Sequence, residues 1–464
     1  MQVRDYTYLG TTKSLCPRCR RLVEAKIVVR GGRVYFRKRC PEHGTIEDFV
    51  CSDVAYFDRH EHAQPARTPR KYGVNPDRGC PYDCGLCTEH EQHTCIALVE
   101  ITSSCNLKCP MCFAESGPGG TFVDFTTYTR MIDRLVEVEG VADIVQLSGG
   151  EPTLHPDLVR MVRYAYEQPI QAVMINTNGL RLGRDPRLVE DLAAMKDRLE
   201  IYLQFDGFDS DTSRKLRGEE SLLDAKLATI ESLAAHGIRV TLVCTVDGLV
   251  NLHEVGAVLK FGLERKAIRG VSYQLASYCG RHVEPSDLER RATMPDLVKA
   301  LAAQAGECIG VEDFYPLPCA HPNCHMVAYL FRGETVTPVS RLIDVRPHMN
   351  LIANSIVYTP ERAKRIVEAA CGCGPEGCGP GGDGFFSKAL AGALTGEDMF
   401  RVTLTGFLDV HTFDTRRVMK CCLAHVLPSG HVVPFCAYNT LYRDGFVPLP
   451  PLADEPARAA RSLL

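Results

Sequence analysis

The chain lacks the features that would direct it into a membrane, out of the cell or onto nucleic acid. None of its apolar runs approaches the roughly 18 residues that a membrane-spanning helix needs. Residues 1–5 do not contain the apolar core of a secretory signal. The formal net charge is −4, and no stripe of basic and aromatic residues is present, so we expect no nucleic-acid partner. We therefore expect a cytoplasmic protein, for which peripheral membrane contact stays open.

What the chain has in abundance is cysteine. There are 22 cysteines among 464 residues, in an otherwise ordinary composition with 45% hydrophobic and 24% charged residues. Disulfides are rare in a reducing compartment, so cysteines that gather into groups indicate metal binding. At roughly 100–200 residues per domain, the length predicts roughly two to four domains. We expect a globular protein that holds more than one iron centre.

The most informative group is Cys105, Cys109 and Cys112, at a C-x3-C-x2-C spacing after the apolar run 96–101. Thiolates are the ligands of iron–sulfur clusters, and a loop of this spacing can hold three corners of a four-iron cluster. Three protein ligands leave one iron free to bind another molecule. The competing interpretation is a structural zinc loop, or a set of buried, reduced thiols.

A mononuclear iron or zinc site is predicted in an N-terminal domain, residues 1–58. Two short knuckles, C-P-R-C and C-P-E-H-G, flank a predicted hairpin and can bring four ligands around one ion. We favour His43 as the fourth ligand because of its C-x2-H spacing, with Cys51 as the alternative. A site closed by four ligands is expected to be structural. The predicted ligands are Cys16, Cys19, Cys40 and His43.

A second C-x3-C-x2-C motif follows the polar stretch 59–71, which we interpret as a linker. No predicted strand precedes this motif, and a fourth cysteine follows it closely. We therefore predict that residues 59–95 bind an auxiliary four-iron cluster at all four corners, with a zinc site of the same ligands as the alternative. The predicted ligands are Cys80, Cys84, Cys87 and Cys95.

Residues 96–305 alternate between strand-like and helical patterns. Six alternations of a buried apolar strand with a helix predict parallel β/α units with right-handed crossovers. The predicted fold class is therefore α/β, a partial (β/α)6 barrel whose chemistry lies at the C-terminal ends of the strands. The predicted strands are 96–102, 143–147, 172–176, 199–205, 239–246 and 270–275, and the predicted helices are 126–139, 157–167, 187–196, 221–235 and 252–263.

Three of the predicted strands end in short polar motifs. S-G-G-E-P at 148–152 follows the second strand, T-N-G at 177–179 the third, and Q-F-D-G at 204–207 the fourth. Glycine lets the backbone approach a ligand closely, although Gly-Gly or Asn-Gly alone is usually only a turn. Arg217 could hold a carboxylate or form a surface salt bridge.

The C-terminal region, residues 306–464, is irregular and contains the remaining cysteine groups. A second auxiliary cluster accounts for four of them, with the neighbouring Cys421 and Cys422 as alternatives for one position. A Gly- and Pro-rich stretch, 371–384, holds Cys371, Cys373 and Cys378; its composition indicates a flexible loop, and we assign it no ligand role. The predicted ligands of the second auxiliary cluster are Cys319, Cys324, Cys421 or Cys422, and Cys436.

The cysteine loop and the G-G-E-P motif together resemble the radical S-adenosylmethionine (SAM) superfamily, which has the same spacing with an aromatic residue, here Phe113, beside the last cysteine. The resemblance implies that the cluster on Cys105, Cys109 and Cys112 binds SAM and cleaves it to a deoxyadenosyl radical. An electron donor such as ferredoxin or flavodoxin is implied as a partner. The residues implied to contact SAM or the substrate are Gly149, Gly150, Glu151, Asn178, Gln204 and Asp206.

The order of the motifs resembles the tetraether synthase family over nearly the whole chain. It runs from C-P-R-C and C-P-E-H-G, through both C-x3-C-x2-C loops, to P-C-A-H-P-N-C and P-F-C-A-Y-N. The resemblance implies a rubredoxin-like mononuclear site, three four-iron clusters, and coupling or modification of isoprenoid lipid chains. The alternative is a radical SAM methyltransferase acting on hydroxymethyl-dihydropterin or a similar small molecule, an activity also linked to the family. A non-catalytic electron-transfer protein is the weakest alternative, because it would not need the G-G-E-P motif or the barrel.

Overall fold

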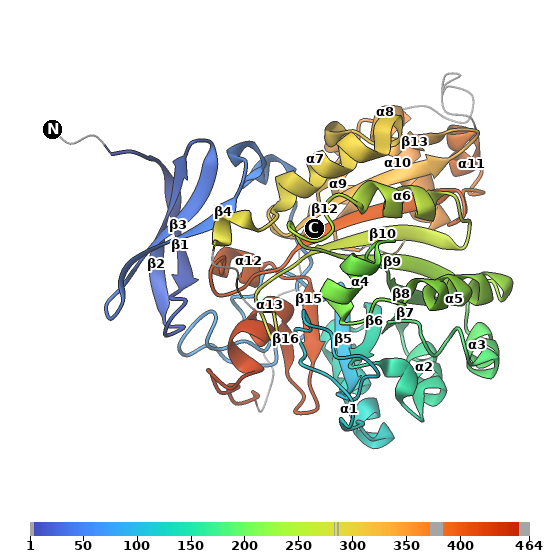
Figure 1. The fold of residues 1–464 in the computed structure, drawn as a ribbon, viewed down its shortest axis with the longest axis horizontal. Coiled ribbons are helices and arrows are strands. Elements are labelled where there is room, and N and C mark those ends of the chain that lie inside the picture. Colours follow the sequence, from blue (N-terminus) through green and yellow to red (C-terminus); the bar gives the residue numbers. More distant parts are fainter. Residues whose placement is uncertain are drawn as a thin grey trace.

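The computed structural model describes residues 4–282, 284, 287–355, 357, 359–371 and 384–453. Cys373, Cys378 and the side chain of Cys371 lie outside this description. The chain forms a four-stranded antiparallel sheet at its N-terminal end and a large mixed sheet from residue 96 onward (Figure 1). None of the helices in the described part of the chain combines the length and apolar character that crossing a bilayer requires.

The N-terminal sheet has the order β1-β2-β3-β4, with each strand antiparallel to the next. The turn between β2 and β3 is Gly31-Gly32, and both residues have positive φ, +58° and +78°, which a two-residue hairpin turn of this twist requires. The predicted hairpin is therefore present, with one further strand on each side. The strands are β1 (Thr7–Leu15), β2 (Leu22–Arg30), β3 (Arg33–Cys40) and β4 (Gly44–Cys51).

The central part of the large sheet consists of six parallel strands in chain order, β5 to β10. Helices connect them on the outside, which confirms the predicted partial barrel (Figure 1). The strands are β5 (Ile96–Thr102), β6 (Ala142–Gly149), β7 (Ile170–Thr177), β8 (Leu199–Gln204), β9 (Arg239–Val246) and β10 (Ile268–Leu275), and the helices are α1 (Phe125–Glu139), α2 (Leu158–Glu167), α3 (Pro186–Ala193), α4 (Ser210–Arg217), α5 (Leu223–Ala235) and α6 (Val255–Leu263).

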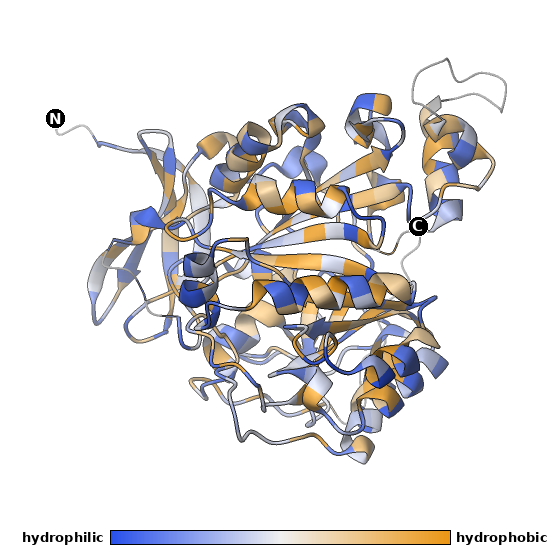
Figure 2. Cartoon of the chain, turned by 45° about the vertical axis from the view of Figure 1, so that its right-hand side comes forward, coloured by the Kyte–Doolittle hydropathy of each residue, from blue (hydrophilic) through white to orange (hydrophobic). Residues whose placement is uncertain are grey.

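The helices cover the barrel with one apolar face each, as α1 illustrates. The side chain of Asp124 accepts a hydrogen bond from the N–H of Thr127 at 2.9 Å and so caps the first turn. Tyr128, Met131 and Leu135 repeat at helical spacing and are fully buried against the sheet. Figure 2 shows the result, with mainly apolar strands inside and helices of mixed character outside.

The C-terminal region extends both edges of the barrel sheet. β14 (Met399–Gly406) pairs in parallel with β10, and β15 (Leu423–Val426) pairs in parallel with β5. Eight parallel strands are therefore adjacent, so the sheet continues across the boundary predicted near residue 305. The outer strands are β11 (Tyr315–Pro316), β12 (His325–Arg332), β13 (Val336–Pro338) and β16 (Val432–Pro434).

The other helices are mostly short. The α-helices are α7 (Met294–Ala305), α8 (Val339–Leu342), α9 (Met349–Ile352), α10 (Pro360–Cys371), α11 (Phe385–Leu390), α12 (Thr415–Met419) and α13 (Phe435–Ala437). The short 3-10 helices are η1 (Val54–Tyr56), η2 (His60–His62), η3 (Pro152–Leu154), η4 (Leu288–Arg290), η5 (Gly306–Cys308), η6 (Val311–Asp313) and η7 (Arg346–His348), and η8 (Tyr438–Tyr442) is a π-helix.

A buried lysine joins the N-terminal sheet to the C-terminal region. Lys38 on β3 is fully buried, and its ammonium donates to the carbonyls of Leu15, Val410 and His411 at 2.9, 3.2 and 2.7 Å. Its ion pair with Asp48 is 2.8 Å long. Burial lowers the pKa of Lys38, and the carboxylate of Asp48 opposes that shift. Because a buried charge without its partners is costly, these contacts fix the position of the N-terminal sheet.

Candidate functional site

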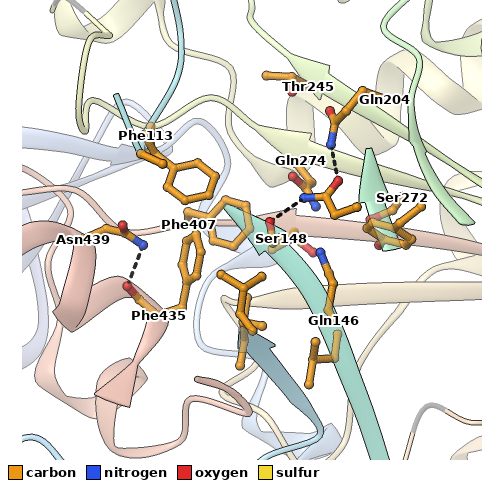
Figure 3. A pocket seen from close by; sticks show the side chains of 18 of the residues that line it. Phe113, Gln146, Ser148, Gln204, Thr245, Ser272, Gln274, Phe407, Phe435 and Asn439 are labelled. Carbon is orange, nitrogen blue, oxygen red and sulfur yellow. Dashed lines mark hydrogen bonds between the residues drawn. The ribbon is translucent and has the colours of Figure 1, made fainter. Parts of the chain in front are cut away.

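A cavity of about 240 Å³ lies inside the barrel (Figure 3). It reaches from the cysteine loop after β5 to Ile96 and Leu317. Most of its surface is apolar, and polar side chains from successive strands are set into one wall. These polar side chains include Gln146, Ser148, Asn176, Gln204, Thr245, Ser272 and Gln274.

The cysteine loop and the G-G-E-P segment contact each other directly. The N–H of Gly150 donates to the carbonyl of Thr102 at 2.6 Å, and the N–H of Glu151 donates to that of Ser104 at 2.8 Å. A Cβ atom at Gly149 would lie 2.1 Å from the carbonyl oxygen of Thr102, and one at Gly150 would lie 2.1 Å from that of Ser104. Both positions therefore require glycine, because any side chain would push the loop away from β6.

The three thiols of the loop fit three corners of a four-iron cluster. Cys105, Cys109 and Cys112 interact with one another and all line the cavity. Burial raises the pKa of Cys105 to about 12, so metal binding must displace its proton. The N–H of Leu107 lies 3.4 Å from the Cys105 sulfur and would offset part of its negative charge. Cys105, Cys109 and Cys112 would hold such a cluster, which together with SAM would supply radical chemistry at the mouth of the barrel.

Glu151 holds the ends of two strands together. Its buried carboxylate accepts hydrogen bonds from the hydroxyls of Thr153 and Thr177, both at 2.6 Å, and from the N–H of Asn178 at 2.8 Å. Oε2 has one protein partner, the N–H of Asn178, and the contact of Glu151 with SAM that the resemblance implies stays a prediction. The side chain of Asn178 in turn donates to Asn106, within the cysteine loop, at 2.7 Å.

A row of polar side chains crosses β6, β7 and β8 and ends at Arg217. Gln204 donates to Asn176 at 2.7 Å, and Asn176 donates to Ser148 at 3.3 Å (Figure 3). Arg217 donates to Gln204 at 2.8 Å. It also interacts with the thiol of Cys109. This cation is therefore fixed in the cavity wall beside the cysteine loop, where it could bind a carboxylate.

Asp206 lies behind Arg217 and holds it in place. Its carboxylate accepts from Arg217 Nη2 at 2.6 Å and Nε at 2.7 Å. Burial alone would raise the pKa of Asp206, but the charge and hydrogen bonds of Arg217 bring that pKa below its ordinary value. Asp206 does not itself line the cavity among the residues described, whereas Gln204 and Arg217 do. The structure thus gives Asp206 a positioning role for Arg217, and its implied contact with SAM or the substrate stays a prediction.

An aromatic wall closes the other side of the cavity. The rings of Phe113 and Phe435 lie 5.3 Å apart, and those of Phe407 and Phe435 lie 4.7 Å apart (Figure 3). His425 stacks on Phe435 at 5.1 Å. Phe407 was not predicted as a site residue. It lies in the loop directly after β14, and the pattern of apolar residues in the sequence did not predict that strand.

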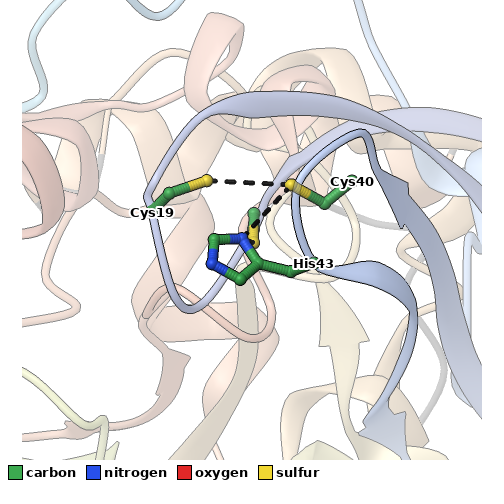
Figure 4. Close-up of side chains that lie close together, drawn as sticks. Cys19, Cys40 and His43 are labelled. Atoms are coloured by element: carbon green, nitrogen blue, oxygen red, sulfur yellow. Dashed lines mark hydrogen bonds between the residues drawn. The ribbon is translucent and has the colours of Figure 1, made fainter.

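The predicted mononuclear site comes together in the N-terminal sheet. One donor atom from each of Cys16, Cys19, Cys40 and His43 lies within 4.8 Å of the others (Figure 4). His43 Nδ1 is 3.5 Å from the sulfurs of Cys16 and Cys40. Cys51, the alternative ligand, instead packs in the core of the sheet and donates to the carbonyl of Asp53 at 3.3 Å. This donor set fits one iron or zinc ion.

The other cysteines form groups in the structure that differ from those predicted from their spacing in the sequence. The motif at 80–87 keeps its three cysteines together. Cys95, the predicted fourth ligand, interacts instead with Cys319 and Cys422. The reason is strand pairing: β15 pairs in parallel with β5, so Cys422 and Cys95 both precede a strand at the same end of the sheet, and the Cys95 N–H donates to the Cys422 carbonyl at 2.8 Å.

Cys421 and Cys422 face different neighbours. Cys421 lies beside Cys324 and Cys436, around a small cavity of about 20 Å³. A cavity of about 10 Å³ lies beside the cysteines at 80–87. Arg417 donates to the sulfur of Cys324 at 3.2 Å, and a cation at this position suits a thiolate. The predicted second auxiliary set, Cys319, Cys324, Cys421 or Cys422, and Cys436, therefore lies in two adjoining groups, and Cys422 interacts with both Cys95 and Cys324.

Comparison with known proteins agrees with this architecture. The HMPTM N-terminal zinc ribbon domain matches residues 8–52, and the radical SAM superfamily matches residues 99–262. The 7,8-dihydro-6-hydroxymethylpterin dimethyltransferase of Methanocaldococcus jannaschii is 30% identical over 489 residues, covering 93% of this chain and 94% of that protein. The Fe-coproporphyrin III synthase of Methanosarcina barkeri is 28% identical over 194 residues, covering 40% of this chain and 45% of that protein.

Among solved structures, Streptococcus suis SuiB bound to S-adenosylmethionine matches with a TM-score of 0.36 at 19% identity, covering 45% of this chain and 46% of that chain. SuiB bound to the precursor peptide SuiA matches with a TM-score of 0.35 at 20% identity, covering 40% of each chain.

Proposed function

The chain belongs to the radical SAM family of the Methanocaldococcus jannaschii dimethyltransferase, and we propose that it activates C–H bonds of alkyl lipid chains. In this proposal it couples or modifies isoprenoid chains in the manner of tetraether synthase. The observation that carries the proposal is the mainly apolar cavity that begins at the three cysteines and runs into the barrel. An alkyl chain is matched by apolar walls, because it offers no group that could pair with buried polar atoms.

The scarcity of acidic side chains in the cavity supports the same substrate class. Glu151 is the one carboxylate among the described lining residues, and its oxygens are held by Thr153, Thr177 and Asn178. These hydrogen bonds leave the carboxylate fewer lone pairs for the N–H groups of a pterin ring. The aromatic wall of Phe113, Phe407 and Phe435 keeps water from the reacting carbon. Arg217 orients a carboxylate group beside the cysteine loop.

The iron centres are part of the proposal. The cysteines at 105–112 hold the cluster that binds SAM, and those at 80–87 hold a first auxiliary cluster. The second auxiliary cluster takes Cys95 together with Cys319 and Cys422. A ferredoxin or flavodoxin supplies electrons, the protein works in the cytoplasm, and contact with the membrane surface gives access to lipid.

The second candidate is methylation of a pterin by the same radical chemistry. The name of the Methanocaldococcus relative favours it. The amides of Gln146 and Gln274, which face into the barrel, also favour it, because amides can read the donor and acceptor edge of a pterin (Figure 3).

The test is mass spectrometry of lipids and pterins from cells with and without the gene. Lipids joined chain to chain, with the loss of hydrogen, only when the gene is present are the expected result. A pterin heavier by methyl groups would replace lipid coupling with the second candidate. Failure of the purified, reduced protein to cleave SAM would contradict both candidate functions. The remaining alternative would then be a non-catalytic electron-transfer protein.

A further inference from the structure

Three potential metal ligands meet outside the barrel cavity and outside every cysteine group. Asp58 and His60 follow the N-terminal sheet, and His321 lies in the loop between β11 and β12. One donor atom from each residue lies within 4.8 Å of the others. The two imidazole rings are 5.5 Å apart and nearly perpendicular, at 77°. Residues more than 250 positions apart in sequence thus offer two nitrogens and a carboxylate to one point.

His321 is the buried member of this group. Its side chain is only 2% exposed, and its Nε2 atom has no hydrogen-bond partner among the described residues. The other ring nitrogen, Nδ1, accepts a long hydrogen bond of 3.3 Å from the N–H of Asn323, so a metal at Nε2 requires the ring proton to move to Nδ1 and this hydrogen bond to be given up. Leaving a buried polar atom unpaired costs about 1–3 kcal/mol, so the position is expensive unless a ligand pairs with it.

The carboxylate of Asp58 is held in a fixed orientation. Its backbone adopts a left-handed conformation, with φ +54°, and its N–H donates to Asn323 Oδ1 at 2.8 Å. Asn323 Nδ2 donates back to Asp58 Oδ1 at 2.7 Å, and Arg416 donates to Oδ2 at 2.9 Å. Each oxygen has a second lone pair for a metal. The positive charge of Arg416 weakens cation binding, so this site must be weaker than one built from thiolates.

We propose that Asp58, His60 and His321 bind a divalent transition-metal ion such as Zn²⁺. Two imidazoles and one carboxylate form a donor set that zinc accepts, with the fourth position open to water. His60 is exposed, so the ion can enter from solvent. The ion would tie the segment after the N-terminal sheet to the loop that carries Cys319 and Cys324. This structural role is separate from the proposed SAM chemistry.

The test is the zinc content of the full-length protein, reconstituted with iron and sulfide without oxygen and measured at equilibrium, by dialysis against a buffer of known Zn²⁺ concentration. We expect His60→Gln and His321→Gln each to hold one zinc fewer per chain than the wild type. The matched control is His62→Gln, which changes the next histidine of the same segment. His62 pairs with Arg59 at 2.7 Å and is not part of the group. Equal zinc content in all four proteins would overturn the proposal.

A second measurement guards against misfolded variants. An ion that binds the folded protein alone raises its melting temperature. Added Zn²⁺ should therefore raise the melting temperature of the wild type and of His62→Gln, and leave that of His60→Gln unchanged. His60 is the informative variant because its exposed side chain is not part of the core. The same rise in His60→Gln would contradict the site even if the His321 variant failed to fold.

Discussion

The metal site of the N-terminal sheet and the cysteine groups around the barrel differ in how they are assembled. The first takes all four ligands from 28 consecutive residues, Cys16 to His43, and one antiparallel sheet brings them together. The group of Cys95, Cys319 and Cys422 needs residues from three distant segments. The spacing of the ligands in the sequence therefore identifies the first kind of site. In the second kind, the pairing of distant strands determines which residues meet.

The largest effect should come from the local loop at 105–112. Replacing Cys109 with Ser removes one of three iron ligands, so we expect complete loss of SAM cleavage in the reduced protein. The iron signals of the other groups should persist, because none of them uses this loop. SAM cleavage by Cys109→Ser at the wild-type rate would show that the motif at 80–87 binds SAM instead.

The next largest effect tests which cysteines share a cluster with Cys95. Strand pairing brings Cys319 and Cys422 close to it, whereas the spacing in the sequence favours the motif at 80–87. Cys95→Ser should lose the cluster that also depends on Cys319 and keep the cluster of the motif at 80–87. Electron paramagnetic resonance of Cys95→Ser, Cys319→Ser and Cys84→Ser measures this. We expect the first two spectra to match each other and to differ from the third. A match between Cys95→Ser and Cys84→Ser would restore the assignment from spacing.

A smaller effect is expected where a barrel residue acts through another residue. Asp206→Ala leaves Arg217 buried without its partner, which should lower the free energy of unfolding by about 3–5 kcal/mol. The folded pKa of Asp206 is below its ordinary value. Its contribution is therefore complete above about pH 4, the ordinary pKa of Asp, and is lost as the pH falls.

Denaturant titrations of the wild type and Asp206→Ala at neutral pH and at acidic pH measure this difference. The gap between the two proteins should narrow toward low pH. A gap that does not depend on pH would mean that packing, and not the ion pair, accounts for the loss.

The smallest effect should come from Cys51. Cys51→Ala removes a core thiol that has no place in the ligand group, so we expect full metal content and a loss of about 1 kcal/mol in stability. The matched variant His43→Ala should lose the metal. Metal counting on both variants measures this, and loss of metal from Cys51→Ala alone would make Cys51 the fourth ligand.

Much of the barrel could be predicted because its strands are buried on both faces. The predicted runs 96–102 and 239–246 coincide with β5 and β9, since both read as continuous apolar segments. Helix α4 was not predicted, because Thr212 and Leu216 are its only buried residues and the rest of its sequence is polar. Helical periodicity needs an apolar face, and this helix has almost none.

The cysteine groups were only partly predictable for a different reason. Cys105, Cys109 and Cys112 form one loop, so their spacing contains the geometry of the site. The partners of Cys95 depend on the pairing of β15 with β5, and no local pattern encodes that pairing. For Cys421 and Cys422, the direction of each side chain follows from the start of β15, which sequence alone did not locate.

The extension of the sheet at both edges has a consequence for how the chain folds. β5 gains its outer neighbour from residues 423–426, and β10 gains its outer neighbour from residues 399–406. While the chain is being synthesised, the edge at β10 therefore stays unpaired until residue 399 has been made, and the edge at β5 until residue 423 has been made. Unpaired edges are where strands of other molecules add. The nascent chain thus passes through a period in which it is prone to aggregate, and truncations before residue 399 should be insoluble.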